Sequence, residues 1–188
     1  VGFIEAFKDN PLMMEAIADS MIDVLTLLQI RANERKQPIT DPAVLRAIDD
    51  AFVEARRLRD ASHAAQARGK RGSFYGLGEI FLRGEVLLLG ALLSFGANFE
   101  VDAAPDMRVI LGENVAPETL EELMSEQTLD LGPLQSIIGP QAYGVGTLTE
   151  DAWNRYRTVA IISLPLKRII GYAQILQRKP TLAQDDRR

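Results

Sequence analysis

The chain has 188 residues, of which 47% are hydrophobic and 25% are charged, an ordinary composition for a globular protein. Its formal net charge of −5 argues against a general nucleic-acid-binding protein, because such proteins normally carry a basic domain. The absence of cysteine excludes disulfides, thiolate metal sites and thiol redox chemistry. A single histidine, His63, likewise excludes a histidine-rich metal site.

The segment from Pro11 to Gln37 is expected to form a helix. Its apolar residues recur at spacings of three or four and therefore share one helical face; they are Met13, Ile17, Met21, Val24 and Leu28. Asn10 is suited to cap the first turn, and Pro11 is suited to the first helical position. The helix should end near Pro38, because proline disfavours a helical conformation in the residue before it.

A second helix is expected from Pro42 to about Gly69, because Thr40-Asp41-Pro42 offers a capping side chain and a proline in the first turn. Its apolar face consists of Leu45, Ile48, Phe52, Ala55 and Leu58. Two such helices, each about 40 Å long and joined by a short link, form an antiparallel hairpin. The first helix is apolar over more of its surface than one partner helix would cover. We therefore expect either the C-terminal domain or a second copy of the chain to cover the rest.

Charge is unevenly distributed along the chain. Residues 56–71 carry six basic residues and one acidic residue, whereas residues 113–130 carry six acidic residues and no basic one. Each run is typical of a solvated face. The alternative is that the basic end of the second helix, with Arg56 and Arg57, docks on the acidic segment. Exposed pairs gain at most ~1 kcal/mol each, so such docking would set orientation more than stability.

After residues 69–72 the sequence changes in character, because glycine becomes frequent and helical spacing gives way to short apolar runs. The expected strands are Phe74–Leu82, Glu85–Leu89, Leu92–Phe95, Phe99–Val101, Arg108–Leu111, Thr158–Ser163 and Arg168–Ile175. Closely spaced short strands with glycine-containing turns predict a small antiparallel β-sandwich or barrel. One short helix is expected within it at Glu118–Gln127, where a proline and acidic residues occupy the first turn.

The sequence thus predicts an α+β chain with three parts. These are a helical hairpin over residues 1–72, a β-domain over residues 73–178 and a polar tail over residues 179–188. No apolar stretch reaches the ~18 residues that a membrane-spanning helix needs. Because the sequence begins with Val1 and not methionine, a removed signal peptide, an omitted anchor and a truncation all stay open. Membrane contact is expected only through an N-terminal anchor of that kind.

Five runs in the β-domain resemble the DM-thirteen domain, a small β-sandwich module. It is found beside DOMON domains in Skeletor-type animal proteins and alone in exported bacterial proteins. The runs are Pro105–Leu111, Leu129–Leu134, Gly139–Tyr143, Arg155–Ser163 and Ile170–Ala173. They are similar to the family's "GPDLxVYL", "DLGPLKG", "GDQNY", "KYRSVVIWC" and "FGVA". The resemblance spans roughly residues 73–177 and implies the fold. It also implies an extracytoplasmic protein, periplasmic or secreted, with or without a membrane tether.

The chain departs from this family at the position tied to its suspected electron transfer. The family's cysteine at the end of "VVIWC" corresponds to Ser163, and Ile162 replaces the tryptophan. A serine hydroxyl has no accessible redox couple and forms no thiolate ligand. The resemblance therefore implies an architecture without that chemistry, and no cofactor is expected.

No catalytic or metal-binding residues can be nominated from the sequence. Asp106 lies near other acidic residues but without calcium-loop spacing, so it is expected to occupy a turn. The aromatic and cationic residues that cluster late in the chain are Tyr143, Trp153, Arg155, Tyr156 and Arg157. They could line an interaction surface with arginine over an aromatic face. Alternatively, Trp153 and Tyr156 belong to the core or its rim.

We therefore expect a non-catalytic binding or assembly protein. Its β-domain would be a scaffold, and its hairpin would contact another protein or a second copy of the chain. The candidate interaction residues are Arg56, Arg57, Tyr143, Arg155 and Arg157. Two alternatives stay open: a redox accessory protein that holds an external cofactor in the β-domain, and an enzyme whose site forms only between subunits.

Overall fold

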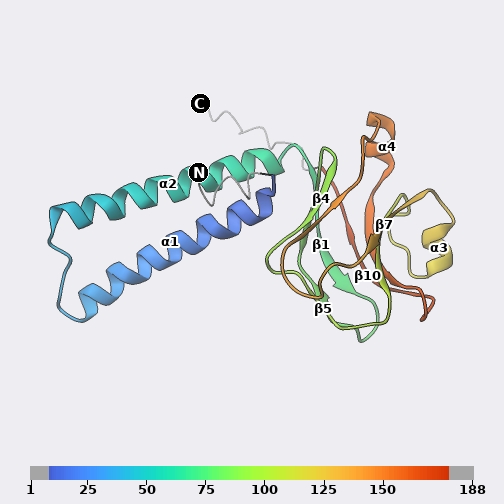
Figure 1. Ribbon diagram of the computed structural model, residues 1–188, viewed down its shortest axis with the longest axis horizontal. Coiled ribbons are helices and arrows are strands. Elements are labelled where there is room, and N and C mark those ends of the chain that lie inside the picture. The colour runs from blue at the N-terminus through green and yellow to red at the C-terminus, as the bar shows by residue number, and fades with distance from the viewer. Residues whose placement is uncertain (1–8, 178–188) are drawn as a thin grey trace, which may run out of the picture. The chain divides into compact units, whose positions relative to one another are not determined.

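The computed structural model describes residues 9–177, drawn as the coloured ribbon in Figure 1. The chain divides into two compact units between Ala65 and Gln66. Within the described range, the first unit contains two helices and the second an antiparallel sheet with two short helices. The predicted α+β class is therefore confirmed. Strand β1 (Lys70–Gly76) begins inside the segment 69–72, where the sequence places the end of the hairpin.

Helices α1 (Pro11–Glu34) and α2 (Pro42–Gln66) form the predicted antiparallel hairpin (Figure 1). Asn10 caps α1, because its side-chain oxygen accepts a hydrogen bond from the backbone N–H of Met13 at 3.1 Å. Each helix ends three residues earlier than the sequence predicts. In α1 the reason is Lys36, which adopts a left-handed φ of 53° and turns the chain towards α2.

Small side chains line the contact between the two helices. Ala18 of α1 and Ala55 of α2 are fully buried in this contact. Larger apolar groups, Ile48 and Leu58 of α2, fill the remaining space. Near the open end of the hairpin, the Ser62 hydroxyl donates a hydrogen bond to the Pro11 carbonyl at 2.5 Å. The interhelical polar contacts of the described residues thus lie in the half of the hairpin that contains Pro11 and Ser62, and the two helices diverge towards their connection (Figure 1).

Among the described residues, eight antiparallel strands form one sheet in the order β7-β6-β9-β10-β1-β3-β4-β8. Besides β1, these strands are β3 (Glu85–Leu89), β4 (Leu92–Phe95), β6 (Met107–Gly112), β7 (Thr128–Pro133), β8 (Gln141–Gly144), β9 (Thr158–Ser163) and β10 (Arg168–Gln174). A separate pair contains β2 (Leu82–Arg83) and β5 (Glu100–Val101). The sheet curls into a nearly closed barrel (Figure 1). Gln135, in the loop after edge strand β7, donates to the Ala142 carbonyl of edge strand β8 at 2.7 Å.

The strand predictions are correct where the chain is strongly apolar. Strands β3, β4 and β9 have the predicted bounds, and β5, β6 and β10 differ from prediction by at most one residue at an end. The prediction of one strand over Phe74–Leu82 is wrong, because a turn at residues 77–81 separates β1 from β2. Strands β7 and β8 are missed. Both are edge strands, and β7 contains Asp130, Gly132 and Pro133, which are uncommon in strands.

Two short helices accompany the sheet. Helix α3 (Leu120–Met124) is shorter than the predicted Glu118–Gln127, because Thr119 caps its start and Ser125 caps its end. Thr119 and Glu122 form a capping box in which the Thr119 hydroxyl accepts from the Glu122 N–H at 3.1 Å. Helix α4 (Glu150–Arg155) is not predicted, although Thr149 caps it by accepting from the N–H of Ala152 at 3.1 Å.

The sheet buries both of its faces around β6, β9 and β10. Side chains alternate between faces along a strand, and those pointing into the barrel are Val109, Leu111, Val159, Ile161 and Ile170. Those pointing outwards are Ile110, Ala160, Ile162, Ile169 and Tyr172. Leu123 of α3 packs against this outer set, so α3 lies against the outside of the sheet (Figure 1). A run such as β9 is therefore apolar at nearly every position.

Two glycines allow β1 and β10 to lie unusually close. A Cβ atom on Gly72 would overlap the carbonyl oxygen of Gln174, and a Cβ on Gly171 would overlap the carbonyl oxygen of Tyr75. The pairing of β10 with β9 shifts register between Ile169 and Gly171, at the same place. The absence of a side chain at Gly72 and at Gly171 thus leaves room for the neighbouring backbone at these two positions.

Candidate functional site

The interior of the barrel is filled by the chain's own aromatic side chains. The rings of Phe74 and Phe95 lie 4.9 Å apart between centroids, and those of Phe95 and Phe99 lie 4.8 Å apart. Tyr143 extends the cluster, with its ring 5.3 Å from that of Phe95. These spacings are typical of a packed aromatic core.

Ser163, which stands where the resembling family has cysteine, is fully buried at the end of β9. Its hydroxyl donates a hydrogen bond to the carbonyl oxygen of Pro105 at 2.6 Å. Its backbone pairs with Met107 on one side and Arg168 on the other. The hydroxyl thus ties the loop before β6 to the end of β9, and solvent does not reach it.

Tyr143 is not part of an interaction surface, which corrects the expectation from the sequence. It is only 4% exposed, and its hydroxyl both accepts and donates a hydrogen bond. The hydroxyl accepts from the backbone N–H of Gln135 at 3.0 Å and donates to the side-chain oxygen of Gln141 at 2.5 Å. Burial raises the pKa of Tyr143, although the hydrogen bond from Gln135 partly offsets this. Its role is to fasten the loop after β7 to β8.

Lys70 occupies a position that the sequence does not suggest. It belongs to the basic run that the sequence assigns to a solvated face, yet it is only 6% exposed. Its ammonium donates to the carbonyl oxygens at the end of α4 and just beyond, those of Trp153 at 2.5 Å, Asn154 at 3.1 Å and Tyr156 at 2.7 Å. It also lies 4.7 Å from the centroid of the Trp153 ring, within reach of a cation–π interaction. Burial, and then the positive charge of Arg157, lower its pKa.

The two arginines of the late cluster differ in their surroundings. Arg155, on α4, makes ion pairs with Glu113 at 3.0 Å and with Asp151 at 3.1 Å. Arg157 is exposed in the link between α4 and β9. Tyr156 between them is buried and Trp153 is half-buried, in agreement with the core or rim alternative. The five residues of this cluster therefore do not form one surface.

A shallow pocket of about 480 Å³ lies beside Trp153. Its walls come from the turn between β3 and β4 and from the segment leading into α4, with Gly90, Ala91, Gly146, Thr147, Leu148 and Glu150. The lining is mostly apolar or small, with one carboxylate. Nothing in it converges on a bound group as the polar residues of a ligand site do.

The two candidate arginines of the hairpin are engaged within α2. Arg57 makes a bidentate ion pair with Glu54, at 2.6 and 2.9 Å. Arg56 lies over the Phe52 ring, with 5.9 Å between the guanidinium carbon and the ring centroid. Docking of this basic end on the acidic segment stays a prediction.

The distal half of the hairpin exposes large apolar side chains. Val24 of α1 is 67% exposed, and other apolar residues of this half are between two-fifths and one-half exposed. They are Leu27, Leu28, Ile30, Val44 and Leu45. The expectation that one partner helix leaves part of α1 uncovered is therefore met in this half of the hairpin. Val24, Leu27 and Leu28 are neighbours on the surface of α1, and exposed apolar surface of this kind is typical of a site of protein association.

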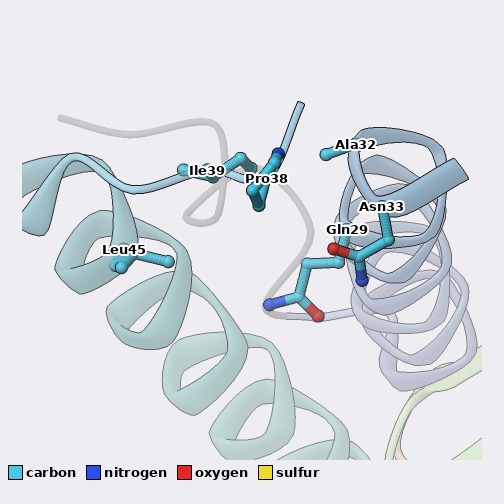
Figure 2. Close-up of a pocket in the computed structure, with 6 residues that line it drawn as sticks. All are labelled: Gln29, Ala32, Asn33, Pro38, Ile39 and Leu45. Atoms are coloured by element: carbon cyan, nitrogen blue, oxygen red, sulfur yellow. The ribbon is translucent and has the colours of Figure 1, made fainter. Parts of the chain in front are cut away.

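A second open pocket, of about 320 Å³, lies at the tip of the hairpin, where the connection joins the two helices (Figure 2). Ala32 and Asn33 line it from α1, Leu45 lines it from α2, and Pro38 and Ile39 line it from the connection. Figure 2 shows the side chain of Gln29 extending from α1 into the space between the two helices. The tip is thus less tightly closed than the rest of the contact.

Within residues 9–177, no group of three or more histidine, aspartate or glutamate side chains could hold a metal ion. Asp106 occupies the turn before β6 with a φ of 43°, and Asp102 accepts a hydrogen bond from the backbone N–H of Phe81. None of the described helices is long and apolar enough to cross a membrane. Comparisons with protein-family models, with curated proteins and with solved structures find no match.

Proposed function

We propose that this chain is a non-catalytic assembly protein whose hairpin binds a protein partner and whose β-domain is a scaffold. The observation that carries the proposal is the exposed apolar surface on the distal half of the hairpin. The interior of the β-domain, as far as the structure describes it, is filled by aromatic rings, and its buried Ser163 hydroxyl donates to a carbonyl. These two features also weigh against a cofactor held inside the barrel.

The free energy available from covering this surface supports a protein contact. Full burial of a valine, leucine or isoleucine side chain is worth about 1.5–3 kcal/mol. Three neighbouring residues of α1 that are about half exposed, Val24, Leu27 and Leu28, would therefore contribute roughly 2–4.5 kcal/mol when covered. That contribution is a substantial part of the free energy of a micromolar complex, about 8 kcal/mol.

For the β-domain we propose kinship with the DM-thirteen domain. The five resembling runs support this, because each coincides with or overlaps a strand: β6, β7, β8, β9 and β10 in order. The proposal includes an extracytoplasmic location, which cell fractionation with a cytoplasmic and a periplasmic marker protein would test. Recovery of the full-length protein with the cytoplasmic marker alone would contradict that location.

Site-specific photo-crosslinking tests the proposed function. A photoreactive amino acid placed at Val24 should give a discrete adduct with another polypeptide when the full chain is expressed in its native cells. Val53 is the matched control, since it is a valine of similar exposure, 60%, on the side of α2 facing away from α1. The proposal is wrong if position 24 gives no more adduct than position 53, or only an adduct within its own chain.

A further inference from the structure

We infer that the partner of the hairpin is a second copy of this chain, and that two hairpins pair into an antiparallel four-helix bundle. The inference rests on the function proposed above and names the partner. The inference comes from a seven-residue repeat in both helices. Residues spaced by seven form rows along each helix, and a single hairpin buries some of these rows and leaves others exposed.

Three rows of residues, each with a spacing of seven, run along α1. The inner row faces α2 and consists of Ala18, Leu25 and Ala32. The middle row consists of Met14, Met21 and Leu28, and the outer row of Ile17, Val24 and Arg31. Solvent exposure rises from the inner row to the outer row. The inner row is buried or half-buried, the middle row is half-buried before Leu28, and the outer row is exposed from Val24 onwards. One hairpin thus covers the inner row and leaves the outer row open.

Helix α2 repeats the pattern. Its inner row, Ile48, Ala55 and Ser62, is fully buried. Its middle row consists of Val44, Ala51, Leu58 and Ala65, and its outer row of Ala47, Glu54 and Ala61. A helix with one partner needs two apolar rows, whereas three rows are typical of a helix inside a bundle. Each helix therefore carries a third row that the hairpin does not use, and this row is apolar except for Arg31 in α1 and Glu54 in α2.

The two outer rows lie on the same side of the hairpin. Polar contacts join the helices on the opposite side, a hydrogen bond between Glu15 and His63 at 2.9 Å and an ion pair between Asp19 and Arg59 at 3.8 Å. At about 100° per residue, the positions of these contacts and the outer row fall on opposite sides of the inner row in both helices. The hairpin thus has one charged side and one largely apolar side.

The apolar side is complementary to itself in size. In the register set by these two polar contacts, Ile17 of α1 is level with Ala61 of α2, and Arg31 is level with Ala47. A two-fold axis parallel to the helices would place α1 of each copy on α2 of the other at the same level. Ile17 and Arg31 of one copy would then lie on Ala61 and Ala47 of the other, Val24 would lie level with Glu54, and all neighbouring helices would be antiparallel.

Charge supports the same arrangement. Across the interface, Asp23 would lie close to Arg57 of the second copy, and Arg31 would lie close to Asp50 of the second copy. Glu54 is the charged member of the α2 outer row, and its ion pair with Arg57 already neutralises it. Opposite charges at the edges of an apolar contact favour one register over others.

The area is sufficient for a stable dimer. Helix α1 has 24 residues and is about 36 Å long, and two packed helices are about 20 Å wide. One side of the hairpin therefore offers on the order of 700 Å², close to the roughly 800 Å² that each partner buries in a standard interface.

Sedimentation equilibrium of the full chain tests the inference. The wild-type chain should approach twice its monomer mass of 20.8 kDa as the concentration rises. Val24→Glu should weaken the dimer at least tenfold, because it places a charged carboxylate within the apolar contact, where it would have to give up its water. Ala47→Glu, in the outer row of α2, should weaken the dimer as well. Val53→Glu, on the side of α2 that faces away from α1, should leave the dimer unchanged.

Disulfide crosslinking tests the arrangement of the two copies. Because the chain has no cysteine of its own, only the introduced cysteines can form a disulfide. Arg31→Cys and Ala47→Cys should crosslink rapidly when the two variants are mixed, and slowly when each is alone. Equal crosslinking of the separate variants would overturn the parallel two-fold axis.

A wild-type chain that stays monomeric while position 24 crosslinks to a different protein would overturn the second copy as partner and keep the proposed function. A monomer whose position 24 gives no specific adduct would overturn both.

Discussion

Replacing Lys70 with methionine should strongly destabilise the β-domain. Methionine keeps the length and the apolar stem of lysine but removes the ammonium. The carbonyl oxygens of Trp153, Asn154 and Tyr156 would then lose their shared donor. These three carbonyls lie at the end of α4 and just beyond it, where helical carbonyls lack partners within the helix.

The expected loss follows from these three contacts. A hydrogen bond with a charged partner contributes about 1.5–3 kcal/mol, and a buried acceptor left without a partner costs about 1–3 kcal/mol. Water can partly hydrate the freed carbonyls, because Trp153 lines an open pocket. We therefore expect the free energy of unfolding to fall by about 3–5 kcal/mol, below the simple sum of three bonds.

Trp153 is the single tryptophan of the chain and lies against Lys70, so its fluorescence reports directly on this region. Urea unfolding of the full-length chain, followed by that fluorescence, should show a lower midpoint with an unchanged slope. Lys167→Met is the control, since Lys167 is an exposed lysine in the turn between β9 and β10. A loss below about 1 kcal/mol for Lys70→Met, or a loss equal to that of the control, would refute the role assigned to the ammonium.

Three further predictions follow from the sheet. Ser163→Cys should fold and bury an unreactive thiol, so a thiol reagent should label it only after unfolding; rapid labelling of the native chain would contradict its burial. Because burial raises the pKa of Tyr143 above 10.0, the folded chain keeps a proton that the unfolded chain releases, and stability should fall as pH rises above 10. Tyr143→Phe should reduce this fall of the free energy of unfolding with pH, as measured by urea unfolding at several pH values. An unchanged pH dependence would count against the raised pKa of Tyr143. A truncated chain of residues 66–188 should still unfold cooperatively, as followed by circular dichroism. A chain of residues 71–188, which also lacks Lys70, should unfold at a clearly lower urea concentration. Equal midpoints would show that Lys70 is dispensable.

Much of the fold is predictable because local preferences and packing agree. The hairpin follows from apolar spacing and from Asn10 and Pro11, which begin α1 as the sequence indicates. Strand β9 is buried on both faces, so its sequence is continuously apolar and easily recognised. Edge strand β7 has no such signature, because half-exposed positions tolerate Asp130 and Gly132.

The side-chain roles are less predictable, because they depend on contacts distant in sequence. Lys70 belongs to a basic run in the sequence, yet its partners lie more than 80 residues away, on and just after α4. Tyr143 looks like part of an aromatic cluster, but the fold turns its ring into the barrel. The three rows of the hairpin, by contrast, are already present in the spacing of its residues. Only the exposure of each residue distinguishes the rows.

The close approach of β1 and β10 at Gly72 and Gly171 limits which substitutions this fold can accept. Any side chain at either position would overlap a carbonyl oxygen of the neighbouring strand. Surface residues and even core residues can drift in size as long as total volume is kept, but these two positions cannot. A pair of glycines about 100 residues apart, each within a strand of a curled sheet, is therefore a search criterion for remote relatives that overall similarity does not detect.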